Sequence, residues 1–358
     1  MADVREMKAL VYRKAGRRFG EVTMVPCPVC GDGQVVIKVM ACGICKWCEL
    51  SHDTPGESEK PLSRYPVIPG HEFAGVIAEV GRDVRGYAVG DRVTADNTVP
   101  CGGCYQCQRG NTLYCEHFGS LGNNINGGFA QYVAVDAAHL FKIPDHVSLE
   151  EASMTEAVAC CVHAIKAADI RLGQTVVVLG AGLQGILLSQ LAVHSNALET
   201  IAIDIEPGKL ALLEKYGVKT VLASPADTAV HEKALEALAP HGVDLVIDTA
   251  GVWPMMKSLF KFLKKGGKYM QYGSFHARET LDITTDMLND IHFKEQRFIG
   301  VSAQTNCFPE AVDYISGGKL DLKPLITHRF PLDRYFEALD VNRDDPTAIK
   351  VVIFPDEA

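Results

Sequence analysis

The stretch Val176-Val177-Val178-Leu179-Gly180-Ala181-Gly182-Leu183-Gln184-Gly185 decides the fold of the second half of this chain. An apolar run precedes three glycines spaced G-x-G-x-x-G, and a segment rich in Leu, Ile and Ala follows. A strand, a glycine turn and a helix in this order form the phosphate-binding corner of doubly wound α/β folds. Free N–H groups at the start of such a helix bind phosphate. We therefore expect a dinucleotide site that contains Gly180, Gly182, Leu183, Gln184 and Gly185.

Asp204 indicates which dinucleotide binds. It ends the next apolar strand, about 20 residues beyond Gly185, where an acidic residue accepts hydrogen bonds from the ribose hydroxyls. The carboxylate would repel a 2′-phosphate, and Ile205 and Glu206 add no positive charge. The sequence therefore favours NAD over NADP, with Lys209 as a further candidate for cofactor binding. The alternative is a glycine turn of some other α/β fold, with Asp204 as a helix cap.

The rest of the chain falls into regions with different patterns of apolar and turn residues. Short β-branched runs with Gly, Pro and Asn between them, at 35–39, 73–80 and 130–135, predict an antiparallel, barrel-like β domain. A helix is expected over 150–168. Alternating strands and helices follow, which predicts a parallel sheet. We expect domains at 1–158, 159–296 and 297–358. The last of these should return to the first domain through strands near 325–327 and 349–353. The apolar segment 298–301 could add a sixth strand to the parallel sheet.

Four cysteines crowd one loop as Cys101-x2-Cys104-x2-Cys107-x7-Cys115. Zn²⁺ accepts four thiolates tetrahedrally, and two-residue gaps let one turn point successive sulfurs at a single centre. We therefore predict a structural zinc lobe over about 96–118. The alternative is a set of disulfides or free buried thiols.

Bulk composition limits the classes of function. The chain has 358 residues, of which 47% are hydrophobic and 22% charged, as in ordinary globular proteins. A formal charge of −9 gives no attraction to phosphate backbones, so nucleic-acid binding is not expected. No apolar stretch is long enough to span a membrane, and no secretory leader is visible. We expect a cytoplasmic protein that acts on a small molecule.

Further motifs carry a family resemblance. They are Gly43-Ile44-Cys45, Gly70-His71-Glu72-Phe73-Ala74-Gly75, Val89-Gly90-Asp91-Arg92-Val93, Gly128-Phe129-Ala130-Gln131-Tyr132-Val133, Met154-Thr155-Glu156-Ala157, the four-cysteine lobe and the dinucleotide fingerprint. With them, almost the whole chain resembles the zinc-dependent medium-chain dehydrogenases, and the sorbitol and polyol dehydrogenases look most similar. The resemblance implies a GroES-like β-barrel catalytic domain, a Rossmann cofactor domain, and a homodimer or homotetramer.

The resemblance also implies a second zinc. Cys45 and His71 would be its ligands, while Glu72 and Glu156 would either bind it or hold its water. Spacing alone leaves Cys42 and Cys48 as competitors of Cys45, because the three cysteines lie two residues apart. The implied reaction transfers hydride to NAD from a secondary alcohol of a polyol, sugar or cyclitol and gives the ketone.

This chain departs from the family pattern at three places. Relatives carry Ser or Thr, then Asp, where this chain has Trp47 and Cys48. Trp47 cannot relay a proton and is expected to form an apolar pocket wall, so the proton path would use water, Glu156, Ser51 or His52. Ala303 stands where sorbitol enzymes place a substrate arginine. Two other interpretations stay open, an iron–sulfur electron carrier and a catalytically silent scaffold that binds zinc and NAD.

Overall fold

The computed structural model describes residues 5–54, 63–275 and 282–357. The chain forms two compact units, each described by itself. The first unit is Met1–Ala159 with Thr305–Ala358, and the second is Cys160–Gln304. Among the described residues, no helix has the length and apolar character needed to cross a membrane.

A seven-stranded sheet organises the first unit. Its strand order is β16-β17-β3-β4-β5-β9, with β8 also paired to β3. The strands are β3 (Gln34–Gly43), β4 (Glu72–Val80), β5 (Arg92–Ala95), β8 (Tyr132–Asp136), β9 (Leu140–Lys142), β16 (Ile326–Pro331) and β17 (Lys350–Phe354). A second sheet pairs β1 (Glu6–Tyr12) with β2 (Gly20–Pro26), antiparallel. Apolar side chains from alternate strand positions form the core, as the β-branched runs predict.

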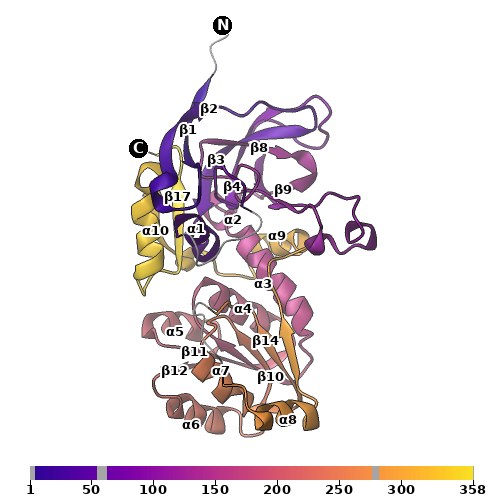
Figure 1. The fold of residues 1–358 in the computed structure, drawn as a ribbon, viewed down its shortest axis with the longest axis vertical. Helices are drawn as coiled ribbons and strands as arrows, with labels where there is room; N and C mark the ends of the chain where they lie inside the picture. The colour runs from indigo at the N-terminus through magenta and orange to yellow at the C-terminus, as the bar shows by residue number, and fades with distance from the viewer. Residues whose placement is uncertain (1–4, 55–62, 276–281, 358) are drawn as a thin grey trace. The chain divides into compact units, whose positions relative to one another are not determined.

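The end of the chain completes this sheet. β17 pairs antiparallel with β3, where Val352 lies opposite Gly43, and β16 runs parallel to β17. Figure 1 shows β17 and α10 (Tyr335–Asp344) beside β1 and β3, although they lie at opposite ends of the sequence. The two ends are also joined by Arg17, whose guanidinium donates to both oxygens of Asp340. The return expected near 349–353 therefore forms a strand that binds directly to the first domain.

Two helices occupy the segment expected as one helix over 150–168. α2 (Leu149–Ala152) begins with a capping box between Ser148 and Glu151, and α3 (Thr155–Ala168) follows after a break. The Thr155 hydroxyl donates to the carbonyl of Ala152 at 2.7 Å, which ties the two helices together. The break makes Glu156 the second residue of a new helix. The first unit also contains α1 (Lys46–Asp53) and α9 (Phe308–Ser316).

The second unit is a parallel six-stranded sheet in the order β12-β11-β10-β13-β14-β15. Its strands are β10 (Gln174–Leu179), β11 (Ala197–Asp204), β12 (Lys219–Leu222), β13 (Val243–Asp248), β14 (Leu263–Gln271) and β15 (Arg297–Gly300). Its helices are α4 (Leu183–His194), α5 (Pro207–Glu214), α6 (Ala229–Leu238), α7 (Trp253–Phe260) and α8 (Thr285–Phe293). From β10 the chain first adds strands on one side, β11 and β12, and then on the other side, from β13 to β15. β10 is therefore at the switch point of a doubly wound fold.

One expected domain boundary differs from the structure. The second unit extends to Gln304, past the boundary expected at 296. The reason is β15, which pairs parallel with β14 and so becomes the sixth strand of this sheet. The chain returns to the first unit only at Thr305.

Candidate active site and cofactor site

Side chains from three separate segments meet in the first unit. Cys45 is the N-cap of α1, His71 and Glu72 stand at the start of β4, and Glu156 lies in the first turn of α3. Two triads of possible metal ligands result, Cys45–Cys48–His71 and His71–Glu72–Glu156. Within each triad the ligand atoms lie within 4.8 Å of one another. His71 belongs to both triads, so it is the centre of the site.

The pairing of β3 with β4 brings these segments together. Gly43, the last residue of β3, lies opposite Glu72 in the sheet, so the residues that follow β3 come next to those that precede β4. A Cβ on Gly43 would lie 2.4 Å from Cε and 2.8 Å from Nζ of Lys350, so a side chain there would displace the ammonium that pairs with Glu72. Gly70 has a φ of +94°, a left-handed conformation that side chains rarely adopt. Both glycines of the sequence motifs thus lie where a side chain would disturb the packing or the backbone.

The imidazole of His71 lies between two carboxylates. Its Nε2 is 4.0 Å from Oε2 of Glu156, and its Nδ1 is 3.8 Å from Oε1 of Glu49. Burial lowers the pKa of His71, but the hydrogen bond with Cys45 and the charges of Glu49 and Glu156 outweigh it and raise that pKa to about 10. Cys45, Glu49 and Glu156 thus make the surroundings of His71 favourable for positive charge.

Glu49 was not singled out by the sequence. It is completely buried, and neither of its carboxylate oxygens has a hydrogen-bond partner among the described residues. Burial raises its pKa to about 8. A histidine that binds a metal through one ring nitrogen is usually oriented by a carboxylate beside its other ring nitrogen. Glu49 fits this position, and sequence reasoning missed it because its burial follows from how α1 packs.

Glu72 has a buried partner from the last strand of the chain. The Lys350 ammonium forms a buried ion pair with the carboxylate of Glu72 and donates to the carbonyl of Ile44 at 3.0 Å. Burial lowers the pKa of Lys350, and the charges of Glu72 and Cys45 more than offset this. Because Lys350 neutralises Glu72, Glu156 is the carboxylate better able to approach a metal ion.

The two remaining site candidates lie outside both triads. Trp47 is 38% exposed in the first turn of α1. His52 is buried, its Nδ1 is 3.0 Å from the hydroxyl of Tyr65, and its ring packs 5.6 Å from that of Tyr12. The expected roles of Trp47 as a pocket wall and of His52 as a proton relay stay predictions.

The four lobe cysteines meet as their spacing predicts. The sulfurs of Cys101, Cys104, Cys107 and Cys115 lie within 4.8 Å of one another. Two 3-10 turns, Cys107–Arg109 and Thr112–Tyr114, fold the loop, and Gly110 between them has a φ of +78°. Hydrogen bonds from the backbone at Cys107 and Glu116 lower the pKa of the Cys104 thiol to about 6. Desolvation and the hydrogen bond with Cys104 instead raise the pKa of Cys107 to about 12. The lobe thus gathers four sulfurs around one point, as a closed zinc site needs.

The glycine turn of the second unit has the expected shape. Gly180 has a φ of +97°, Gly182 is the N-cap of α4, and Leu183 begins that helix. A Cβ on Gly185 would lie 1.9 Å from the carbonyl oxygen of Gly180, so the helix can approach the strand only with glycine there. Thr249 closes the turn from β13, because its hydroxyl donates to the carbonyl of Leu179 at 2.8 Å. The free amides at the start of α4 can bind phosphate.

The other cofactor candidates differ in their surroundings. Asp204 ends β11, where its carboxylate accepts from the amides of Ala181 at 2.5 Å and Glu206 at 2.8 Å. This fixes the carboxylate beside the glycine turn. The side-chain oxygen of Gln184 instead accepts from the Tyr272 hydroxyl at 2.9 Å, so it faces protein. Lys209 lies in the first turn of α5, half-buried.

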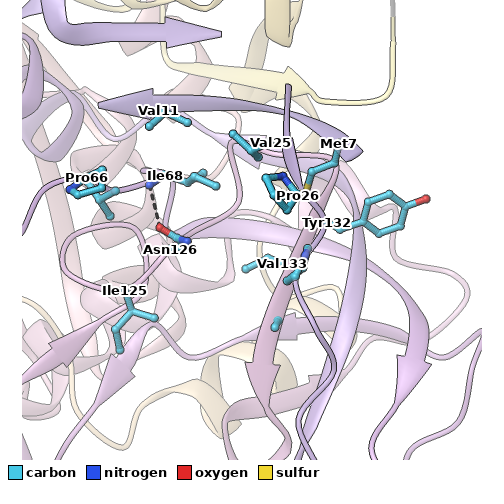
Figure 2. A pocket seen from close by; sticks show the side chains of 13 residues that line it. Met7, Val11, Val25, Pro26, Pro66, Ile68, Ile125, Asn126, Tyr132 and Val133 are labelled. Carbon is cyan, nitrogen blue, oxygen red and sulfur yellow. Dashed lines mark hydrogen bonds between the residues drawn. The ribbon is translucent and has the colours of Figure 1, made fainter. Parts of the chain in front are cut away.

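A separate apolar hollow of about 440 Å³ lies in the first unit, between the β1–β2 sheet and β8. Figure 2 shows Met7, Val25 and Val133 along its wall, and Oδ1 of Asn126 accepting the amide of Ile68 at 3.0 Å. None of the candidate metal ligands lines it. It is therefore distinct from the site around His71.

Comparison with known proteins identifies the family. Residues 31–145 match the alcohol dehydrogenase GroES-like domain, and residues 185–317 match the zinc-binding dehydrogenase family. D-arabinitol dehydrogenase 1 of Uromyces fabae is 32% identical over 339 residues, which cover 94% of this chain and 93% of that protein.

Solved structures indicate the same family. A protein of Sinorhizobium meliloti 1021, described as a zinc-binding dehydrogenase and bound to NADP, has a TM-score of 0.88 at 32% identity, covering 98% of this chain and 100% of its own. Galactitol-1-phosphate dehydrogenase of Escherichia coli has a TM-score of 0.84 at 27% identity, with the same coverage. The expected fold and enzyme class are confirmed, and neither the iron–sulfur carrier nor the silent scaffold gains support. This chain belongs to the zinc-dependent medium-chain dehydrogenases.

Proposed function

We propose that this enzyme oxidises a secondary alcohol of a polyol, sugar or cyclitol to the ketone, with NAD as hydride acceptor. The observation that carries the proposal is the pair of donor triads that share His71, Cys45–Cys48–His71 and His71–Glu72–Glu156. When bound there, zinc would supply a Lewis acid that favours loss of the hydroxyl proton, and NAD would accept the hydride. A second zinc in the lobe would be structural.

The residues around the cluster have separable tasks. Cys45 and the Nε2 of His71 offer the donors, while Glu49 on the Nδ1 side keeps the ring oriented. Lys350 offsets the charge of Glu72, which limits the negative charge that the site accumulates. Glu156 stands beside Nε2 of His71, where it can bind the ion or accept a proton.

NAD, rather than NADP, is the proposed cofactor. Asp204 lies against the glycine turn, and the side chain of Glu206 caps α5 by accepting the amide of Gly208. Two carboxylates there oppose a 2′-phosphate. Replacing Asp204 by Ala removes hydrogen bonds to the ribose, each about 1.5–3 kcal/mol when one partner is charged, so the KM for NAD should rise about 10-fold or more. If Asp204→Ala kept the wild-type KM for NAD and the wild-type preference for NAD over NADP, this assignment would be contradicted.

A substrate screen tests the activity. Pentitols, hexitols, their phosphates, inositols and simple secondary alcohols are offered with NAD or NADP, and reduced cofactor is followed by absorbance. We expect turnover on a polyol with NAD, and two zinc ions per chain by metal analysis. Turnover confined to simple alcohols would overturn the substrate class. A protein that binds zinc and NAD but oxidises none of the panel would contradict the proposed function.

Two features of the whole protein belong to the same proposal. We propose a homodimer or homotetramer, as the family resemblance implies, which light scattering of the purified protein tests. We also propose a cytoplasmic location, because the four thiols of the lobe bind zinc only while they are reduced.

A further inference from the structure

Cys48 is the feature of the site that the family pattern does not explain. It lies three residues after Cys45, at a position where the family resemblance implies aspartate. Cys45 is the N-cap of α1, and Cys48 is the third residue of that helix. Side chains at these two positions face each other across the first turn, as they do in a capping box. The helix start therefore brings the two sulfurs together.

The positions of the donor atoms agree with this expectation. The sulfurs of Cys45 and Cys48 and a nitrogen of His71 all lie within 4.8 Å of one another. A single ion can bind all three, because zinc accepts thiolates at about 2.3 Å and imidazole at about 2.0 Å. The other triad contains Glu72, which already forms the ion pair with Lys350. Of the two triads, the one with two sulfurs therefore offers the donors that zinc binds more strongly.

We propose that Cys48 is a direct ligand of the catalytic zinc, so that two thiolates, Cys45 and Cys48, bind the ion together with His71. This inference rests on the proposed function, because it concerns the same ion. Glu156 beside His71 is then not needed as a ligand, so the fourth position can take substrate. Two thiolates place more negative charge on the ion than one, so this site binds zinc more tightly and is a weaker Lewis acid than a site with one thiolate.

Cys42 provides a matched control. It has the same two-residue gap from Cys45, on the other side, but it belongs to β3, where it pairs with Phe73. It is completely buried and belongs to neither triad. Spacing alone cannot choose between Cys42 and Cys48 as partner of Cys45. The structure selects Cys48, so replacing the two cysteines should have different effects on the metal.

Cobalt substitution tests the inference directly. The wild type, Cys48→Ser and Cys42→Ala are prepared under reducing conditions with Co²⁺ in place of zinc, and the metal content is measured. Thiolate-to-cobalt charge-transfer absorption counts the sulfurs, and the lobe contributes equally in all three proteins. We expect Cys48→Ser to lose the absorption of one thiolate and Cys42→Ala to lose none. Full thiolate absorption in Cys48→Ser overturns the inference.

Zinc affinity gives a second measurement without turnover. In competition with a chelator, Cys48→Ser should bind the catalytic zinc more weakly by at least the ~10–100-fold typical of losing an outer partner of a ligand. If Cys48→Ser does not fold, Cys48→Ala is measured in the same way. Affinities equal to that of the Cys42→Ala control would contradict the inference.

The result is independent of the substrate screen. If the wild type oxidises no alcohol while Cys48→Ser loses a thiolate, the proposed function fails and the ligand assignment stands. If the wild type oxidises a polyol and Cys48→Ser keeps its full thiolate absorption, the function stands and the ligand assignment fails.

Discussion

The two cysteine clusters of this chain differ in how their donor atoms are assembled. The lobe takes four sulfurs from one short loop, while the site around His71 takes donors from α1, the start of β4 and α3. Four like donors close a metal site, whereas mixed donors with buried carboxylates around them can leave a position for substrate. This contrast indicates that the lobe serves stability and the His71 site serves catalysis, and each variant below tests that division.

The largest effect is expected from His71→Ala. Lewis-acid catalysis supplies several kcal/mol, and each 1.4 kcal/mol is a factor of ten, so kcat/KM should fall about 1,000-fold. The measurement is steady-state turnover with the best polyol, together with zinc content. The control is His117→Ala, an exposed histidine next to the lobe, which should keep its activity. Equal activity in both variants would contradict the division.

Cys107→Ser should show the opposite pattern. Loss of a structural metal belongs to the changes that cost on the order of 4 kcal/mol of stability. We expect a lower melting temperature and one zinc lost, with turnover per folded molecule within about twofold of the wild type. Thermal unfolding and turnover are measured on the same preparation. A variant that stays as stable as the wild type but loses turnover would assign catalysis to the lobe.

Lys350→Met tests the buried charge of the His71 site. Removing one partner of a buried ion pair costs about 3–5 kcal/mol, because Glu72 keeps an uncompensated charge. Chemical denaturation measures the loss. The double variant Lys350→Met with Glu72→Gln should recover most of the stability, and failure to recover would mean that Lys350 stabilises the fold by another route.

Glu49→Gln should have the smallest of these effects. It keeps the shape of the side chain but removes the carboxylate beside Nδ1 of His71, and losing such a partner costs about 10–100-fold in metal affinity or activity. The matched change in the other cluster is Glu116→Gln, where the side chain is exposed and little effect is expected. Zinc competition on both variants gives the comparison. Equal affinities would exclude an orienting role for Glu49.

How far sequence reasoning reaches follows from the same contrast. The lobe and the glycine turn depend on local spacing, so the order of residues alone predicts the clusters at Cys101 to Cys115 and Gly180 to Gly185. It does not predict the role of Lys350, because its approach to Glu72 requires β17 to pair with β3, far apart in the chain. Spacing also could not choose between Cys42 and Cys48, since only α1 turns one of them toward His71.

The most direct test of two distinct metal sites is an anomalous difference map of crystals grown with zinc and NAD, collected at the zinc absorption edge. The division predicts two peaks in each chain, one among Cys101, Cys104, Cys107 and Cys115 and one beside His71, within bonding distance of Cys45. A single peak in the lobe, with protein side chains filling the space beside His71, would contradict it.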